Sequence, residues 1–148
     1  MITDAGSEFL RQGLKDQIDL ALERIQPHLV ELRHGMWDAI GRTTPDAPRQ
    51  AANSARELVD QLLKEGALAT CATRGERLRY LMAANRGSAQ VSDTDLEIAN
   101  ATWKLIDAED RGLKRSVHQR GSPTQEDVRA SIEAVERMLR LIFPQPVG

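Results

Sequence analysis

One basic segment, residues 103–121, holds the residue types best suited to chemistry. Its second half contains no acid, and its cationic side chains are Arg111, Lys114, Arg115, His118 and Arg120. Arg111 and His118 are seven residues apart, so on a helix both point to nearly the same side with an axial offset of about 10 Å. Arginine offers a fixed charge and a planar fork for phosphate oxygens, and histidine exchanges a proton near neutral pH. The pairing suits cleavage of RNA.

This segment also has a simpler interpretation. Cations at the end of a helix favour its negative C-terminal pole, so the segment could be only a solvated basic helix end. A second basic cluster surrounds Tyr80 and consists of Arg74, Arg77, Arg79 and Arg86. Arg77 could extend an RNA-binding surface that includes Lys114, Arg115 and Arg120. The alternative is an ordinary charged face, because one aromatic side chain is a weak stacking platform.

Length and composition indicate a single domain, 1–148, with an aliphatic core. The 148 residues are 41% hydrophobic but only 3% aromatic, which suits closely packed helices. A net charge of −2 argues against a surface committed as a whole to nucleic acid, so any contact with RNA must be local. Residues 1–9 include GlySerGluPhe, a sequence that adjoining cloning sites often encode, and we assign them no function.

Other kinds of site find little support. Cys71 is the only cysteine, so we expect no internal disulfide, an inert buried thiol and a reducing, cytoplasmic setting. His28 and His34 lack a second metal-type residue at suitable spacing and should be partly exposed helical residues. We therefore expect no metal and no cofactor. No apolar run approaches the length of a membrane span, and no leader opens the chain.

Hydrophobic periodicity predicts helices throughout the chain. A stripe with steps of three and four runs from about residue 7 to 41, and Pro27 interrupts it. We expect either one long kinked helix there or two helices that meet near Gln26. Further helices are predicted at about 47–65, 74–85, 92–117 and 124–143. The fold class is therefore all-α, an up-and-down bundle of four to five helices with a long N-terminal helix.

Asp110 is unusual because it falls on the apolar stripe of the helix that starts near Ser92. A carboxylate on a buried face needs a partner. Asp110 is therefore expected either to pair with an arginine of another helix or to mark the point where the bundle opens to solvent. We favour the opening, because the segment from Arg111 to His118 begins there.

Three stretches together resemble the HEPN superfamily of small all-helical proteins in bacterial toxin–antitoxin and defence systems, including predicted nucleases near prokaryotic PIWI proteins. These stretches are AsnSerAlaArgGluLeuValAspGlnLeuLeu from Asn53, ThrArgGlyGluArgLeuArgTyrLeu from Thr73, and ValHisGlnArgGlySerProThrGlnGluAspVal from Val117. The family carries an arginine, four to six residues and then a histidine, and the matching residues here are Arg111 and His118. The resemblance spans about residues 47–143.

The resemblance implies metal-independent cleavage of RNA. A neutral His118 would take the proton of a ribose 2′-hydroxyl, and Arg111 would stabilise charge on the phosphoryl oxygens. It also implies a homodimer that brings two Arg-His pairs together across a shared groove. One His118 would then be the base and the other the acid.

A competing interpretation belongs to another class of protein. The chain could be a non-catalytic helical module that dimerises, or that binds and controls a larger effector such as a nuclease, ATPase or sensor. The heptad-like N-terminal stripe, the weak basicity and Gly112 favour this interpretation, because active family members often carry a polar residue at that position. A plain antitoxin-like neutraliser is a third possibility.

Overall fold

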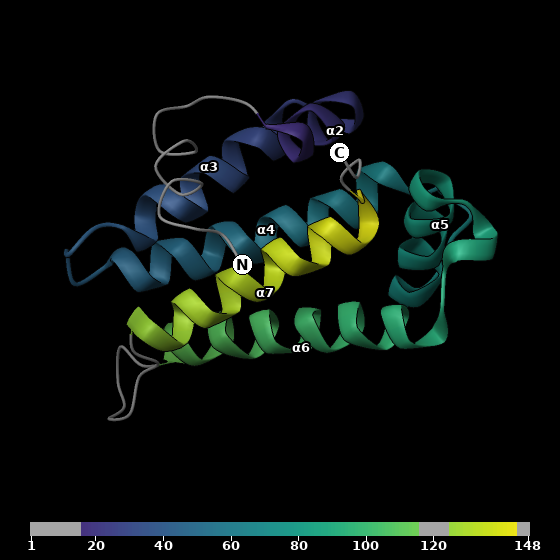
Figure 1. The fold of residues 1–148 in the computed structure, drawn as a ribbon. Coiled ribbons are helices and arrows are strands. Elements are labelled where there is room, and N and C mark those ends of the chain that lie inside the picture. Colours follow the sequence, from purple (N-terminus) through teal and green to yellow (C-terminus); the bar gives the residue numbers. More distant parts are fainter. Residues whose placement is uncertain (1–15, 116–124, 145–148) are drawn as a thin grey trace.

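The computed structural model describes residues 16–115 and 125–144. These ranges hold six α-helices, one short 3-10 helix and no strand, which confirms the all-α class (Figure 1). The elements in order are α2 (Gln17–Ile25), α3 (His28–Ile40), α4 (Ala47–Gly66), α5 (Arg74–Arg86), η1 (Ser88–Gln90), α6 (Asp93–Arg115) and α7 (Gln125–Ile142).

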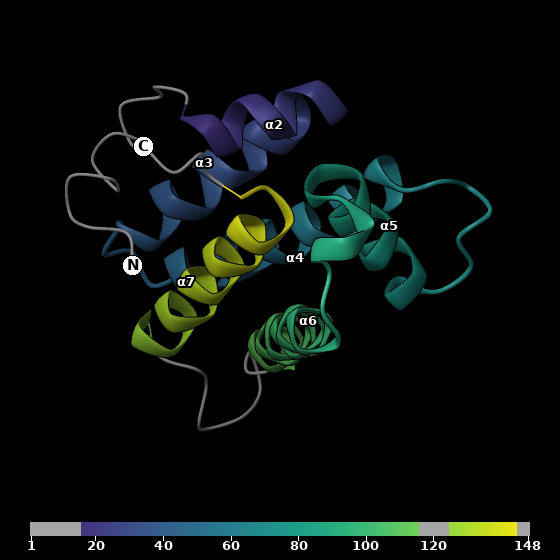
Figure 2. The same cartoon turned by 45° about the vertical axis from the view of Figure 1, so that its right-hand side comes forward.

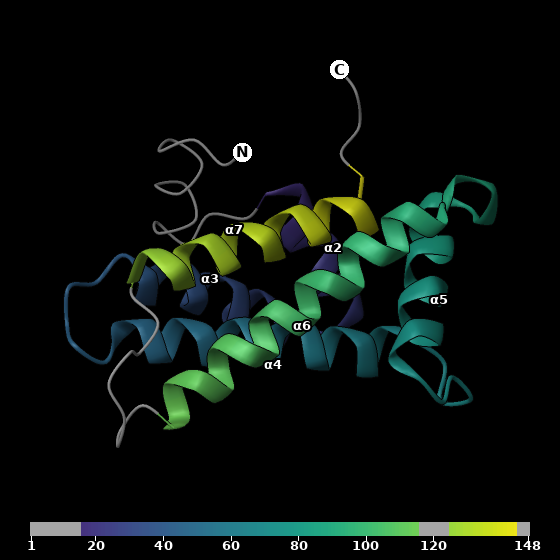
Figure 3. The same ribbon diagram turned by 90° about the horizontal axis from the view of Figure 1, so that it is seen from below.

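The four long helices α3, α4, α6 and α7 alternate in direction along the chain (Figure 1). α4 is central, because it packs against α3, α6 and α7 and also contacts α2 and α5. α5 stands across one end of this arrangement, and Figure 3 shows it beside the start of α6. The α3–α4 pair and the α6–α7 pair therefore enclose the core between them.

The N-terminal stripe forms two helices, the second of the two arrangements that Pro27 allowed. Gln26 adopts an extended conformation after α2, and α3 starts directly after Pro27. Proline suits the start of a helix because its missing N–H would have no partner in the first turn. Because this stripe splits, the described residues hold six helices where we expected four to five.

The core is aliphatic, as the composition predicted. Small side chains on α4 allow its neighbours to approach, with Ala51, Ala52 and Ala55 all buried. At the other end of α4, a Cβ on Gly66 would lie 2.5 Å from Cδ2 of Leu81. Glycine is thus the residue that permits α5 to pack against the end of α4.

Helix ends follow the sequence signals with one exception. The hydroxyl of Ser92 accepts from the backbone N–H of Asp95 at 3.1 Å, as a cap at the start of α6 should. Asp46 occupies the N-cap position of α4, but its side chain makes no capping hydrogen bond there. In the part of the chain that the structure describes, no helix is long and apolar enough to cross a membrane.

Candidate functional site

The Arg-His segment lies only partly within the described residues. The backbone of Arg111, Lys114 and Arg115 belongs to the last turns of α6. Their side chains and that of Asp110, together with all of His118 and Arg120, lie outside the part that the structure describes. The predicted site thus stays a prediction, and its one placed feature is that Arg111 lies near the C-terminal end of a 23-residue helix.

Arg77 lies on a different helix from Lys114 and Arg115. It is on α5, where its Nε donates to the backbone carbonyl of Cys71 at 3.2 Å. Figures 1 and 3 place α5 at the N-terminal end of α6, away from the end that carries Arg111. The structure does not bring these two arginines together.

Arg74 and Arg86 of the second basic cluster contact neighbouring helices. The guanidinium of Arg74 lies 4.5 Å from the ring centroid of Trp103 on α6, a cation–π contact. Arg86 pairs with Asp95 at 2.9 Å and donates to the carbonyl of Leu141 at 3.1 Å. These contacts join α5 to α6 and to the end of α7. They favour a structural role over a surface for RNA.

A buried ionic cluster connects α2, α3 and α7. Arg33, only 1% exposed, donates from Nε and Nη2 to the two carboxylate oxygens of Glu136, each at 2.8 Å. Its Nη1 donates to Asp19 at 2.8 Å and to Asp16 at 2.6 Å. Trp37 adds an indole N–H that donates to Glu136 at 2.8 Å. Arg33 therefore joins α2 and α3, which are neighbours in sequence, to the distant helix α7.

Electrostatics within the cluster favour the ionised forms. Burial by itself would lower the pKa of Arg33, but hydrogen bonds and charge from Glu136 and Asp16 raise it, so the guanidinium stays charged. Burial by itself would raise the pKa of Asp16. Arg33, the backbone N–H of Asp19 and His34 outweigh burial and hold the pKa of Asp16 below its usual range.

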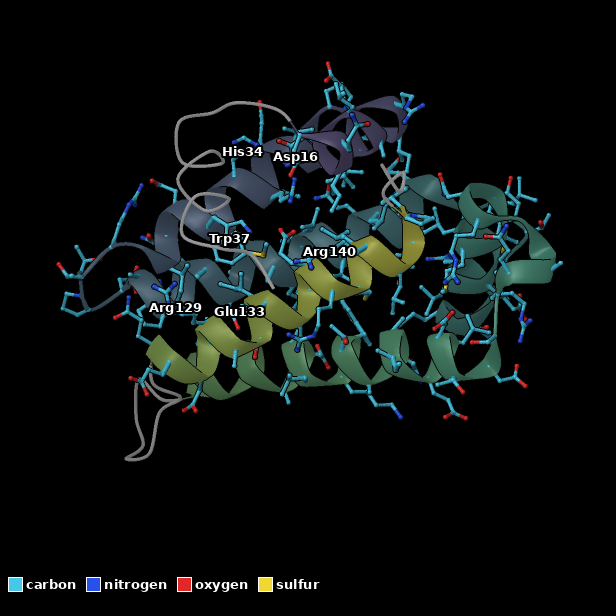
Figure 4. All side chains as sticks on the ribbon, in the orientation of Figure 1. Asp16, His34, Trp37, Arg129, Glu133 and Arg140 are labelled. Carbon is cyan, nitrogen blue, oxygen red and sulfur yellow. The ribbon has the colours of Figure 1, made fainter. Side chains whose placement is uncertain are left out.

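Two members of the cluster, His34 and Asp16, remain in contact with solvent. The His34 side chain is 18% exposed, and its Nε2 lies 2.5 Å from Oδ2 of the fully buried Asp19. A carboxylate that is ionised can only accept, and in that state Nε2 of His34 is the donor of this hydrogen bond. Figure 4 shows His34 and Asp16 close together near the junction of α2 and α3.

The geometry of His34 and Asp19 resembles the base-and-orienter half of a hydrolytic site. Such a site also needs a nucleophile within hydrogen-bond reach of the histidine. Among the described residues, no hydroxyl or thiol makes a hydrogen bond to His34. The cluster is thus complete as a structural unit, and its chemistry is that of a buried, satisfied ion network.

Sequence reasoning missed this cluster, although one signal could have found it. Arg33 falls between Leu29 and Met36 at steps of four and three, so it shares the buried face of α3. We treated His34 as a lone helical histidine and did not consider Arg33. Asp19 and Glu136 likewise fall beside the apolar positions of α2 and α7.

Two surface pockets lie along α5. One, of about 470 Å³, is lined in part by Cys71, Arg79 and Tyr80. Cys71 is partly exposed at its edge, so our expectation of a buried thiol is wrong, because Cys71 lies in the loop before α5 and not on a helix face. Within the described ranges, no group of three potential metal ligands comes together.

Comparisons with protein-family models, with curated proteins and with solved structures found no match to this chain.

Proposed function

We propose that this chain is a HEPN-like component of a bacterial defence or toxin–antitoxin system and acts as a metal-independent endoribonuclease in the cytoplasm. The observation that supports the proposal is the course of α6, which continues through Arg115. Arg111 thus lies on a helix end, and His118 follows three residues beyond the last described residue of that helix. The up-and-down HEPN-like bundle is part of the same proposal.

The proposed reaction is an internal transesterification. Neutral His118 accepts the proton of the ribose 2′-hydroxyl, whose oxygen attacks the adjacent phosphorus. The bond from phosphorus to the 5′-oxygen breaks as that oxygen takes a proton from water, which leaves a 2′,3′-cyclic phosphate, a 5′-hydroxyl and a protonated His118 that returns its proton to solvent. Arg111 stabilises the charge that develops on the phosphoryl oxygens. Lys114, Arg115 and Arg120 hold the neighbouring phosphates.

The test is incubation of the purified protein with mixed RNA in EDTA, followed by analysis of the product ends. Cleavage that leaves 2′,3′-cyclic phosphate and that is lost in both Arg111→Ala and His118→Ala supports the proposal. Arg79→Ala is the matched control, because it removes an arginine from α5 and should leave the rate unchanged. Absence of cleavage by the wild-type protein contradicts the proposal.

A regulatory dimerisation module is the second candidate. One observation favours it: α6 presents exposed apolar side chains on its outer face, notably Ile98 and Leu105. In this case the chain would bind a second copy or a larger effector and have no activity of its own. Stable co-purification with a protein encoded next to it, without RNA cleavage, would favour the module.

A further inference from the structure

The outer face of α6 carries an apolar stripe with heptad spacing. Ile98 and Leu105 are large hydrophobic residues that are 46% and 43% exposed. Ala101, between these two residues, and Ala108, after Leu105, are also exposed. The steps from 98 to 101, 105 and 108 are three, four and three, the pattern of a narrow seam between two helices.

The rest of the protein packs against the opposite side of α6. There the buried residues Ala99, Trp103 and Ile106 face the core, and α4, α5 and α7 supply the contacts. Figure 2 looks nearly along the axis of α6 and shows these three helices gathered on one side of it. Among the described elements, none covers the stripe.

The sizes of the side chains favour an antiparallel helix as the partner. Large and small residues alternate along the stripe, so two parallel copies would place Ile98 against itself and Ala101 against itself. Two antiparallel copies instead place each large residue against a small one, which allows close approach and interdigitation. In one such register Ile98 faces Ala101, and Leu105 faces Thr94.

Charges beside the stripe favour the same register. Glu97 and Lys104 are both exposed and lie on the same flank, one heptad apart. A two-fold axis between residues 99 and 100 places Glu97 of each copy within two residues, about 3 Å along the helix axis, of the level of Lys104 of the other, a distance that the two long side chains can span. Two opposite-charge pairs then border the apolar seam, and antiparallel helix dipoles add a favourable term.

We propose that two copies of this chain associate through their α6 helices in this antiparallel register. Glu97 and Lys104 form the two symmetry-related charge pairs, and Ile98, Ala101 and Leu105 form the apolar centre, with Thr94 opposite Leu105. This inference assigns a surface to a second copy of the chain, and it rests on the proposed function only for its consequence at Arg111.

The consequence concerns the distance between the two Arg-His segments. Each Arg111 lies more than eleven residues from the two-fold axis, so the two would be about 35 Å apart along the helix axes. The α6 pair therefore cannot form the shared groove that the family resemblance implies. Any cleavage in this dimer uses one Arg-His pair at each site.

Charge reversal tests the register. We expect Glu97→Lys and Lys104→Glu each to weaken the dimer about tenfold, because each turns two attractive pairs into repulsive ones. The double variant restores both pairs and should return to wild-type affinity. Sedimentation equilibrium over a range of concentrations measures the change, and circular dichroism checks the fold. A wild-type protein that stays monomeric at every concentration overturns the proposal.

Cysteine cross-linking tests the orientation. In a Cys71→Ser background, Thr94→Cys and Leu105→Cys are made in separate chains. Antiparallel pairing brings positions 94 and 105 of different copies together, so oxidation should cross-link the mixture and not either variant alone. Cross-linking of each variant with itself would indicate parallel helices and overturn the proposal.

The two proposals fail separately. RNA cleavage in EDTA tests the nuclease, and the mass of the particle tests the interface. A protein that dimerises but does not cleave RNA contradicts the proposed nuclease activity and leaves the proposed α6 interface standing. A protein that cleaves RNA but remains a monomer contradicts the proposed α6 interface and leaves the proposed nuclease activity standing.

Discussion

Arg33 and Arg111 lie in two regions that differ in the acidic residues around the positive charge. Arg33 is 1% exposed and makes ion pairs with three carboxylates from α2 and α7. Arg111 begins a stretch through residue 120 that has several cations and no acid. The first arginine is paired inside the fold, whereas the second follows Glu109 and Asp110 directly and opens a run without acids.

This contrast separates structural from functional charge. A buried cation must be paired because its desolvation costs several kcal/mol, and each guanidinium nitrogen of Arg33 donates to a carboxylate. A cation that binds phosphate must remain free of internal acids until the ligand arrives. The cluster around Arg33 should thus determine stability, and the segment from Arg111 to His118 should determine activity.

The largest expected effect comes from Arg33→Met. It leaves Asp19 and Glu136 buried without their cation, so we expect a loss of about 3–5 kcal/mol in the free energy of unfolding. Arg33→Lys keeps the charge but not the planar fork, so its free energy of unfolding should lie between those of Arg33→Met and the wild type. Urea denaturation measures both. Arg79→Met on the exposed side of α5 is the control, and an equal loss there would refute the contrast.

Trp37→Phe should have the next largest effect. It removes the indole donor to Glu136, and we expect a cost of about 1–3 kcal/mol. The double variant Trp37→Phe/Glu136→Gln distinguishes a lost hydrogen bond from lost packing. If the hydrogen bond contributes to stability, the double variant loses less free energy of unfolding than the two single variants lose in sum. Additive costs would mean that only packing was lost.

Acid should destabilise the protein through Asp16, with a smaller effect. The pKa of Asp16 is lowered in the fold, so the folded state favours the ionised form. This contribution is present above about pH 4, the ordinary pKa of aspartate, and is lost as the pH falls through the lower folded value. Thermal unfolding between neutral and acid pH should show a shallower decline for Asp16→Asn than for the wild type.

Asp60→Asn, on the exposed side of α4, is the control for removal of any one carboxylate. If it flattens the acid dependence as much as Asp16→Asn does, the ion pair with Arg33 is not the cause.

Arg111→Ala and His118→Ala should have the smallest effect on stability. We expect each to change the free energy of unfolding by less than about 0.5 kcal/mol, the usual range for surface substitutions. Both should nonetheless abolish the proposed cleavage of RNA. Parallel denaturation curves and cleavage assays make the comparison, and strong destabilisation by either variant would place that side chain in the core instead.

Local signals in the sequence predicted most helix boundaries. The break at Pro27, the start of α6 after Ser92 and the end of α7 before Pro144 depend on caps and prolines, which act within a few residues. The predicted helix at 74–85 corresponds to α5, which ends at Arg86. Periodicity alone could not decide between a kinked helix and two helices, because both arrangements satisfy the same apolar stripe.

The sequence by itself therefore determined the all-α class, the aliphatic core and the order of the helices, because these follow from local propensity and spacing. Only the tertiary structure decided that Arg33 would meet Asp19 and Glu136, since the pairing with Glu136 spans 103 residues. The apolar stripe of α6 was also visible in the sequence, and Trp103 and Ile106 on it are buried. Only the packing of the other described helices shows that Ile98 and Leu105 on the opposite side remain exposed, because a side chain is covered only where a neighbouring helix lies against it.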